Sequence, residues 1–177
     1  SERCPTQRVA ERKLAALEGA QEGLLFSSGM AAITTTLLTV LQPGDHLLVQ
    51  DCLYGGTHDF ITKDLDAFGV RYDFIDAGDP DSWKRHLQPN TRAIYVETMS
   101  NPLLDVPDLK AVTEFSKTHG LTSMVDNTFA SPINFRPAEW GFDLSLHSCT
   151  KYLNGHSDIV AGAVIGSNVW IQKQRSD

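Results

Sequence analysis

The chain has 177 residues, of which 41% are hydrophobic and 21% charged, and 15 basic residues stand against 22 acidic ones for a net charge of −7. This length fits one domain with its own core, and the composition excludes disordered, collagen-like and coiled-coil proteins. Because the balance is acidic, we expect no nucleic-acid partner and no binding to an anionic membrane surface, whereas a single phosphate group remains a suitable ligand.

Helix-like and strand-like segments alternate along the chain. An apolar stripe at helical spacing predicts a helix over residues 6–17, then a short strand over 24–26 and a mostly buried helix over 30–41. Further on we expect strands over 46–50, 70–75, 93–97, 121–125, 144–147 and 159–165, and helices over 56–68, 80–87 and 108–119. The alternation predicts an α/β fold with a mostly parallel sheet flanked by helices, forming one domain over residues 1–177.

Three features bear on the cellular compartment. The cysteines Cys4, Cys52 and Cys149 are too few and too scattered for a disulfide framework, which favours reduced thiols. The uncharged stretch 23–44 has about the length of a membrane span, but its hydroxyl residues and glycines make it too polar for one. The first residues show no signal-peptide pattern, so we expect a soluble cytoplasmic protein.

Polar residues follow the predicted strands repeatedly. They occur at residues 28–30, 51–54, 97–101, 126–128 and 148–151. Turn-forming residues at strand ends explain each group taken alone. Because ligands bind beyond the carboxyl ends of parallel strands, the five groups together predict one shared site.

Lys151 is the most informative of these residues, since it directly follows an apolar strand and a run of small hydroxyl and thiol residues. Most lysines are simply solvated. The alternative is an amine desolvated in a cleft, where it acts as a nucleophile toward a carbonyl group. Such a lysine suits a Schiff base with pyridoxal phosphate.

That cofactor would require further groups. Its phosphate needs a helix N-terminus and hydroxyl donors, for which residues 28–30, Ser148 and Thr150 are candidates. Its ring nitrogen needs a carboxylate, and Asp126 suits that position, although a helix cap or turn explains it equally well. Tyr54 is either a ring-stacking residue or an exposed loop aromatic.

Two other kinds of site are weaker interpretations. A hydrolase built on Ser28 or Ser157 with a histidine lacks the Gly-x-Ser-x-Gly turn and leaves Lys151 unexplained. His58 and His156 have no third metal ligand at a typical spacing, so we expect no metal site.

The segment 148–158, Ser-Cys-Thr-Lys-Tyr-Leu-Asn-Gly-His-Ser-Asp, closely resembles the lysine signature of the Cys/Met-metabolism family of pyridoxal-phosphate enzymes. Segments 25–32, 54–57, 97–102 and 125–129 match other motifs of that family in the same order. The resemblance covers essentially the whole chain. It implies the large domain of a fold-type-I, aminotransferase-like enzyme that assembles as a homo-oligomer, a dimer of dimers.

The resemblance also implies a reaction and a role for each site residue. Family members carry out β- or γ-elimination, or γ-replacement, on small sulfur amino acids or activated homoserines, as in cystathionine lyases and synthases. By similarity, Lys151 is the Schiff-base lysine and proton shuttle, and Tyr54 is the ring-stacking tyrosine that also moves a proton. The other implied cofactor-binding residues are Gly29, Met30, Ser148 and Thr150 for the phosphate, Asp126 for the ring nitrogen, Thr128 near the ring and Asn101 near the phenolic oxygen.

The chain departs from the family pattern mildly at Met99-Ser100, which replace the usual Pro-Thr or Pro-Ser, and more strongly towards both ends. Relatives have a Tyr-Ser-Arg-x-x-Asn-Pro-Thr motif whose Tyr and Arg reach a neighbouring subunit's phosphate, whereas here Arg3 stands close to Pro5 and no tyrosine precedes it. Relatives also have a C-terminal domain that supplies an arginine for the substrate carboxylate, and we expect that domain to lie outside these residues. The alternative function is therefore a cofactor-binding but inactive fragment, or an assembly partner.

Overall fold

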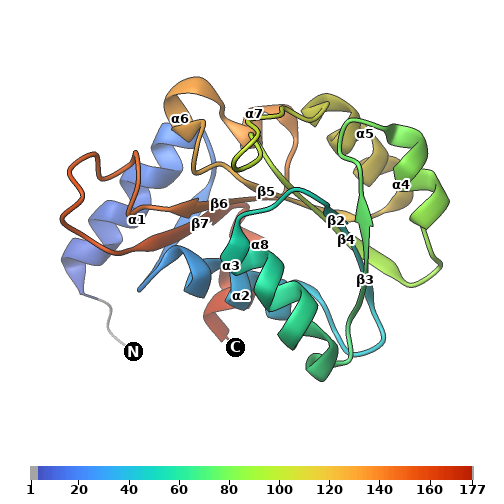
Figure 1. Cartoon of the computed structure of the whole chain (residues 1–177). Coiled ribbons are helices and arrows are strands. Elements are labelled where there is room, and N and C mark those ends of the chain that lie inside the picture. The colour runs from blue at the N-terminus through green and yellow to red at the C-terminus, as the bar shows by residue number, and fades with distance from the viewer. Residues whose placement is uncertain (1–3, 177) are drawn as a thin grey trace.

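A seven-stranded sheet in the order β1-β7-β6-β5-β4-β2-β3 runs through the middle of the molecule in the computed structural model, which describes residues 4–176 (Figure 1). The strands are β1 (Glu22–Phe26), β2 (His46–Gln50), β3 (Arg71–Ile75), β4 (Thr91–Glu97), β5 (Thr122–Asp126), β6 (Leu144–Ser148) and β7 (Gly162–Gly166). All pairings among β2 to β6 are parallel, and β7 pairs antiparallel with both β1 and β6. The prediction of an α/β fold with a mostly parallel sheet is confirmed.

Helices cover both faces of this sheet (Figure 1). One face carries α1 (Pro5–Glu18), α4 (Pro80–His86), α5 (Leu109–His119), α6 (Ser131–Asn134) and α7 (Pro137–Trp140). The other carries α2 (Gly29–Val40), α3 (Gly55–Asp59), the π-helical turn η1 (Phe60–Asp64), the 3₁₀ turn η2 (Leu65–Phe68) and α8 (Asn168–Ser176). Alternate strand residues pack into the two cores, so Leu47 and Val49 face α2 whereas Leu48 packs with Trp83 on the other side.

Local sequence explains where several elements begin and end. The Asp79 side chain accepts a hydrogen bond from Asp81 N at 3.0 Å and caps α4. Asp108 caps α5 by accepting from Ala111 N at 2.9 Å, so α5 begins one residue later than expected. Gly120 ends α5 with φ of 65°, a left-handed conformation that glycine adopts without steric cost.

The local structure differs from the predictions in three respects. The helix expected over 56–68 is a succession of α, π and 3₁₀ turns. The strand expected over 159–165 begins only at Gly162, because the backbone of Ala161 hydrogen-bonds the Thr150 hydroxyl instead of a neighbouring strand. Helices α6, α7 and α8 were not predicted, and the first two are only four residues long, which is too short for a hydrophobic period.

Within residues 4–176, no helix is both long and apolar enough to span a bilayer. The three cysteines are free thiols in this structure, as expected. Burial raises the pKa of the Cys149 thiol to about 11, so this cysteine stays protonated although it adjoins the candidate site. The cytoplasmic location itself stays a prediction.

Candidate cofactor site

A cavity of about 990 Å³ lies where β4, β5 and β6 end and α2 begins. A volume of this size accommodates a small-molecule cofactor. Every site residue expected from the sequence lines it: Gly29, Met30, Tyr54, Asn101, Asp126, Thr128, Ser148, Thr150 and Lys151. The structure thus brings together residues from five separate segments, although of the polar group 51–54 only Tyr54 contributes.

The N-terminus of α2 forms one side of the cavity. The Ser28 hydroxyl accepts from Ala31 N at 3.0 Å and caps the helix, which leaves the first amides of α2, at Gly29 and Met30, without partners inside the helix. A Cβ at Gly29 would stand 2.8 Å from Ser148 Cβ, so only glycine lets α2 approach the end of β6 this closely. Backbone amides beside a serine hydroxyl form a cradle that fits the phosphate of pyridoxal phosphate.

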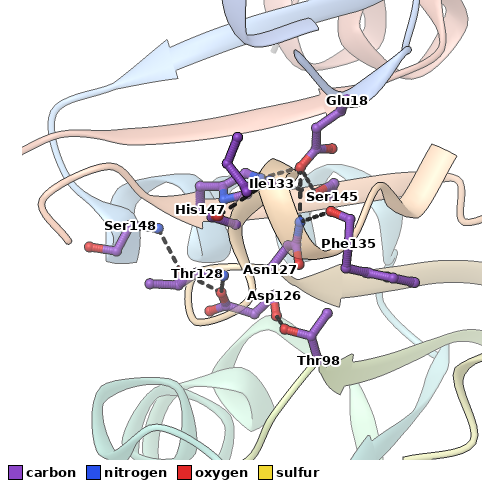
Figure 2. A network of polar contacts seen from close by, with 11 residues as sticks. Glu18, Thr98, Asp126, Asn127, Thr128, Ile133, Phe135, Ser145, His147 and Ser148 are labelled. Carbon is purple, nitrogen blue, oxygen red and sulfur yellow. Dashed lines mark hydrogen bonds and ion pairs between the residues drawn. The ribbon is translucent and has the colours of Figure 1, made fainter. Parts of the chain in front are cut away.

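Asp126 is the last residue of β5 and is buried at the cavity (Figure 2). Thr128 donates to Asp126 Oδ1 twice, from N at 3.0 Å and from Oγ1 at 2.6 Å, and Thr128 Oγ1 in turn accepts from Ser148 N at 2.8 Å. Burial raises the pKa of Asp126, and the Thr128 hydrogen bonds oppose that rise. A cationic group opposite this carboxylate, such as a protonated ring nitrogen, would stabilise its charged form, so Asp126 also fits the cofactor.

Glu97 is a cavity residue that the sequence reasoning did not single out. It is buried at the end of β4 and paired in register with Asp126. Burial raises its pKa to about 8, the hydrogen bond from Tyr54 N to Oε1 at 2.7 Å opposes this, and the Asp126 charge adds to it. Glu97 is therefore mostly protonated at neutral pH. The sequence feature that could have identified Glu97 is its position as the first residue of the polar group 97–101.

Lys151 lies on a turn at the cavity mouth, and its side chain is exposed. The turn is fixed by hydrogen bonds from Lys151 N to Ser148 O at 3.2 Å and from Gly155 N to Lys151 O at 2.9 Å. Lys151 nevertheless lines the cavity, and the expectation of a desolvated amine stays a prediction. Arg3 lies outside the described residues.

A family profile described as Cys/Met metabolism PLP-dependent enzyme matches residues 2–176. The chain belongs to this family. Its cofactor is accordingly pyridoxal phosphate, for which the Gly29–Ser148 cradle and the Asp126 carboxylate form a suitable site.

Relatives in the Cys/Met-metabolism family agree with this assignment. The chain is 45% identical to a Bacillus subtilis cystathionine beta-lyase over 96% of this chain and 43% of that protein. It is 43% identical to a Pseudomonas putida L-methionine gamma-lyase over 97% of this chain and 43% of that protein. Its fold matches the crystal structure of Lactobacillus plantarum cystathionine gamma-lyase complexed with L-serine, with a TM-score of 0.93, 38% identity and coverage of 97% of this chain and 45% of that one. The chain thus spans under half the length of these relatives.

The geometry gives no support to the other two kinds of site. Within the described chain neither Ser28 nor Ser157 hydrogen-bonds a histidine, and Ser28 is occupied as a helix cap. The His58 ring stacks on Phe74 at 5.4 Å, and His156 Nδ1 contacts Asn154 O at 3.1 Å. No cluster of three or more His, Cys, Asp or Glu side chains suited to a metal ion occurs in residues 4–176.

Proposed function

We propose that this chain is the cofactor-binding part of an enzyme that performs β- or γ-elimination, or γ-replacement, on a sulfur amino acid or an activated homoserine, as cystathionine lyases and synthases do. One observation carries the proposal: a phosphate cradle, a buried carboxylate, a loop tyrosine and a lysine from separate segments line a single cavity. The names of the relatives support the same class of reaction.

Bound pyridoxal phosphate supplies an electron sink that stabilises a carbanion at the substrate α-carbon. In this proposal the amides of Gly29 and Met30 and the hydroxyls of Ser148 and Thr150 bind the phosphate. Asp126 would hold the protonated ring nitrogen, and Thr128 orients that carboxylate by donating to Oδ1.

Lys151 would hold the cofactor covalently through Nζ, and its free amine would take and return protons at the substrate α- and β-carbons. Tyr54 packs its ring against the cofactor and moves a proton, and Glu97 fixes the Tyr54 backbone by accepting from its amide. Asn101 also lines the cavity, and by similarity to the family it would hold the cofactor's phenolic oxygen and the substrate carboxylate.

The same resemblance leads us to propose a homo-oligomer. Apolar side chains around the cavity mouth are exposed, with Tyr152 at 63% and Val160 at 69%, and a second copy of the chain would cover them. Light scattering of the purified protein tests this proposal, since a monomer would contradict it.

The activity test uses the purified protein saturated with pyridoxal phosphate and three substrates: cystathionine, methionine and an O-acylhomoserine. Release of thiol, α-keto acid and ammonia is measured for the wild type, for Lys151→Ala and for the control Lys173→Ala, which alters an exposed lysine on α8. We expect products from the wild type and the control only. Turnover by Lys151→Ala would contradict the proposal, and no product from any of these substrates would favour the alternative, a cofactor-binding but inactive chain.

A further inference from the structure

A buried carboxylate lies on the side of the sheet opposite the cavity. Glu18, the last residue of α1, is fully buried, and three side chains contact its Oε1 (Figure 2). Ser145 Oγ donates at 3.0 Å and Asn127 Nδ2 at 3.2 Å, and the His147 imidazole makes a short contact through Nε2. All three partners are themselves buried. Such a concentration of buried polar groups is costly unless the groups satisfy one another.

The partners of Glu18 are immediate neighbours of cavity residues. Asn127 directly follows Asp126, and His147 directly precedes Ser148. Because successive strand side chains point to opposite faces, Asn127 and His147 face α1 while Asp126 and Ser148 line the cavity. One carboxylate on α1 therefore contacts the ends of both β5 and β6, the strands that carry Asp126 and Ser148.

The strand ends are also tied on the cavity side, so the junction is fixed from both faces. Between the strand backbones, Asn127 N donates to Leu146 O at 2.8 Å. On the cavity side, Ser148 N donates to Thr128 Oγ1 at 2.8 Å (Figure 2). Any change in the distance between the ends of β5 and β6 would move Asp126 relative to Ser148.

We propose that Glu18 and His147 are positioning residues of the pyridoxal phosphate site, which set the separation between Asp126 and Ser148 from behind the sheet. This inference rests on the cofactor site proposed above, in which Asp126 meets the ring nitrogen and Ser148 the phosphate. Burial raises the pKa of Asp126, and the hydrogen bonds from Thr128 together with a Coulombic contribution from His147 oppose that rise.

The test must separate positioning from simple stabilisation, because losing a buried acceptor also destabilises the fold. Glu18→Ala removes the acceptor, whereas Glu18→Gln keeps an acceptor oxygen without the charge. Glu11→Gln is the matched control, since Glu11 is buried on the same helix but accepts from Leu25 N of β1 at 3.2 Å. For each protein we would measure the free energy of unfolding without cofactor, the Kd for pyridoxal phosphate and the visible circular dichroism per bound cofactor.

We expect Glu18→Ala to raise the Kd by about tenfold or more and to change the visible circular dichroism, with Glu18→Gln intermediate. Glu11→Gln should lower stability while its Kd and spectrum match the wild type. If Glu18→Ala does not fold, Ser145→Ala, which removes one donor, replaces it, with an expected rise in Kd of about threefold.

Two results would overturn the inference, and they are distinguishable. If the folded Glu18 and Ser145 variants bind pyridoxal phosphate with the wild-type Kd and spectrum, the network is structural only and the proposed function is untouched. If the wild type itself does not bind pyridoxal phosphate, both proposals fail together.

Discussion

Replacing Glu97 by glutamine is expected to change how stability depends on pH. Burial raises the folded-state pKa of Glu97 from 4.5 to about 8, so between these values the folded protein keeps a proton that the unfolded chain releases. Wild-type stability therefore falls as pH rises through this window, by about 1.4 kcal/mol for each pH unit. The loss amounts to about 3 kcal/mol at pH 7 and about 5 kcal/mol above pH 8. Glutamine can still accept from Tyr54 N and carries no titrating proton, so Glu97→Gln lacks this loss.

The assay compares denaturant unfolding of the cofactor-free wild type and Glu97→Gln from about pH 5 to about pH 9. We expect the variant to gain stability relative to the wild type steadily up to about pH 8 and then to level off. Infrared difference spectra should show a protonated carboxyl in the wild type at neutral pH that Glu97→Gln lacks. A stability difference that is constant with pH, or a Glu97 already ionised at pH 6, would refute this reasoning.

Two further substitutions distinguish effects on cofactor binding at the cradle from effects on the stability of the fold. Gly29→Ala is expected to weaken pyridoxal phosphate binding about tenfold and to cost about 1–3 kcal/mol of stability, because its Cβ would stand 2.8 Å from Ser148 Cβ. An absorbance titration with pyridoxal phosphate checks this. Gly55→Ala is the control, because its Cβ would meet no atom within 4 Å. Asp108→Ala removes the cap bond to Ala111 N and is expected to cost about 1 kcal/mol in denaturant unfolding without changing cofactor affinity.

Each of these has a result that counts against it. Equal cofactor affinity in Gly29→Ala and Gly55→Ala would mean that the close approach of α2 to β6 does not form the cradle. A loss of affinity in Asp108→Ala would mean that α5 influences the site, although no residue of α5 lines the cavity.

The sequence predicted the architecture because its signals are local. Hydrophobic runs ended by polar groups mark the strands of a parallel sheet, and glycines such as Gly69 and Gly120 end the preceding helices in a left-handed conformation. The short helices α6 and α7 left no such signal, since each begins at or next to a proline and lasts a single turn. Local patterns also assigned residues 159–161 to a strand, because they cannot show that Thr150 takes up the backbone groups of Ala161.

In the candidate site, too, some features could be predicted from the sequence and others depend on the fold. Resemblance and position at strand ends together identified residues that do share one cavity. The exposure of Lys151 and the protonation of Glu97 depend on what surrounds them in space, which neighbouring residues in the chain do not reveal. Glu18 and His147 are 129 positions apart, so their contact follows only from the fold, which places α1 against the predicted strand 144–147.

The central claim is that Lys151 holds pyridoxal phosphate in this cavity, and covalent trapping tests it most directly. The purified protein is incubated with the cofactor and reduced with borohydride, and the modified lysine is located by peptide mass spectrometry, with Lys151→Ala as the control. We predict a visible absorption band before reduction and a pyridoxyl group on Lys151 afterwards, both lost in Lys151→Ala. A pyridoxyl group on another lysine, or a band that persists in Lys151→Ala, would contradict the account.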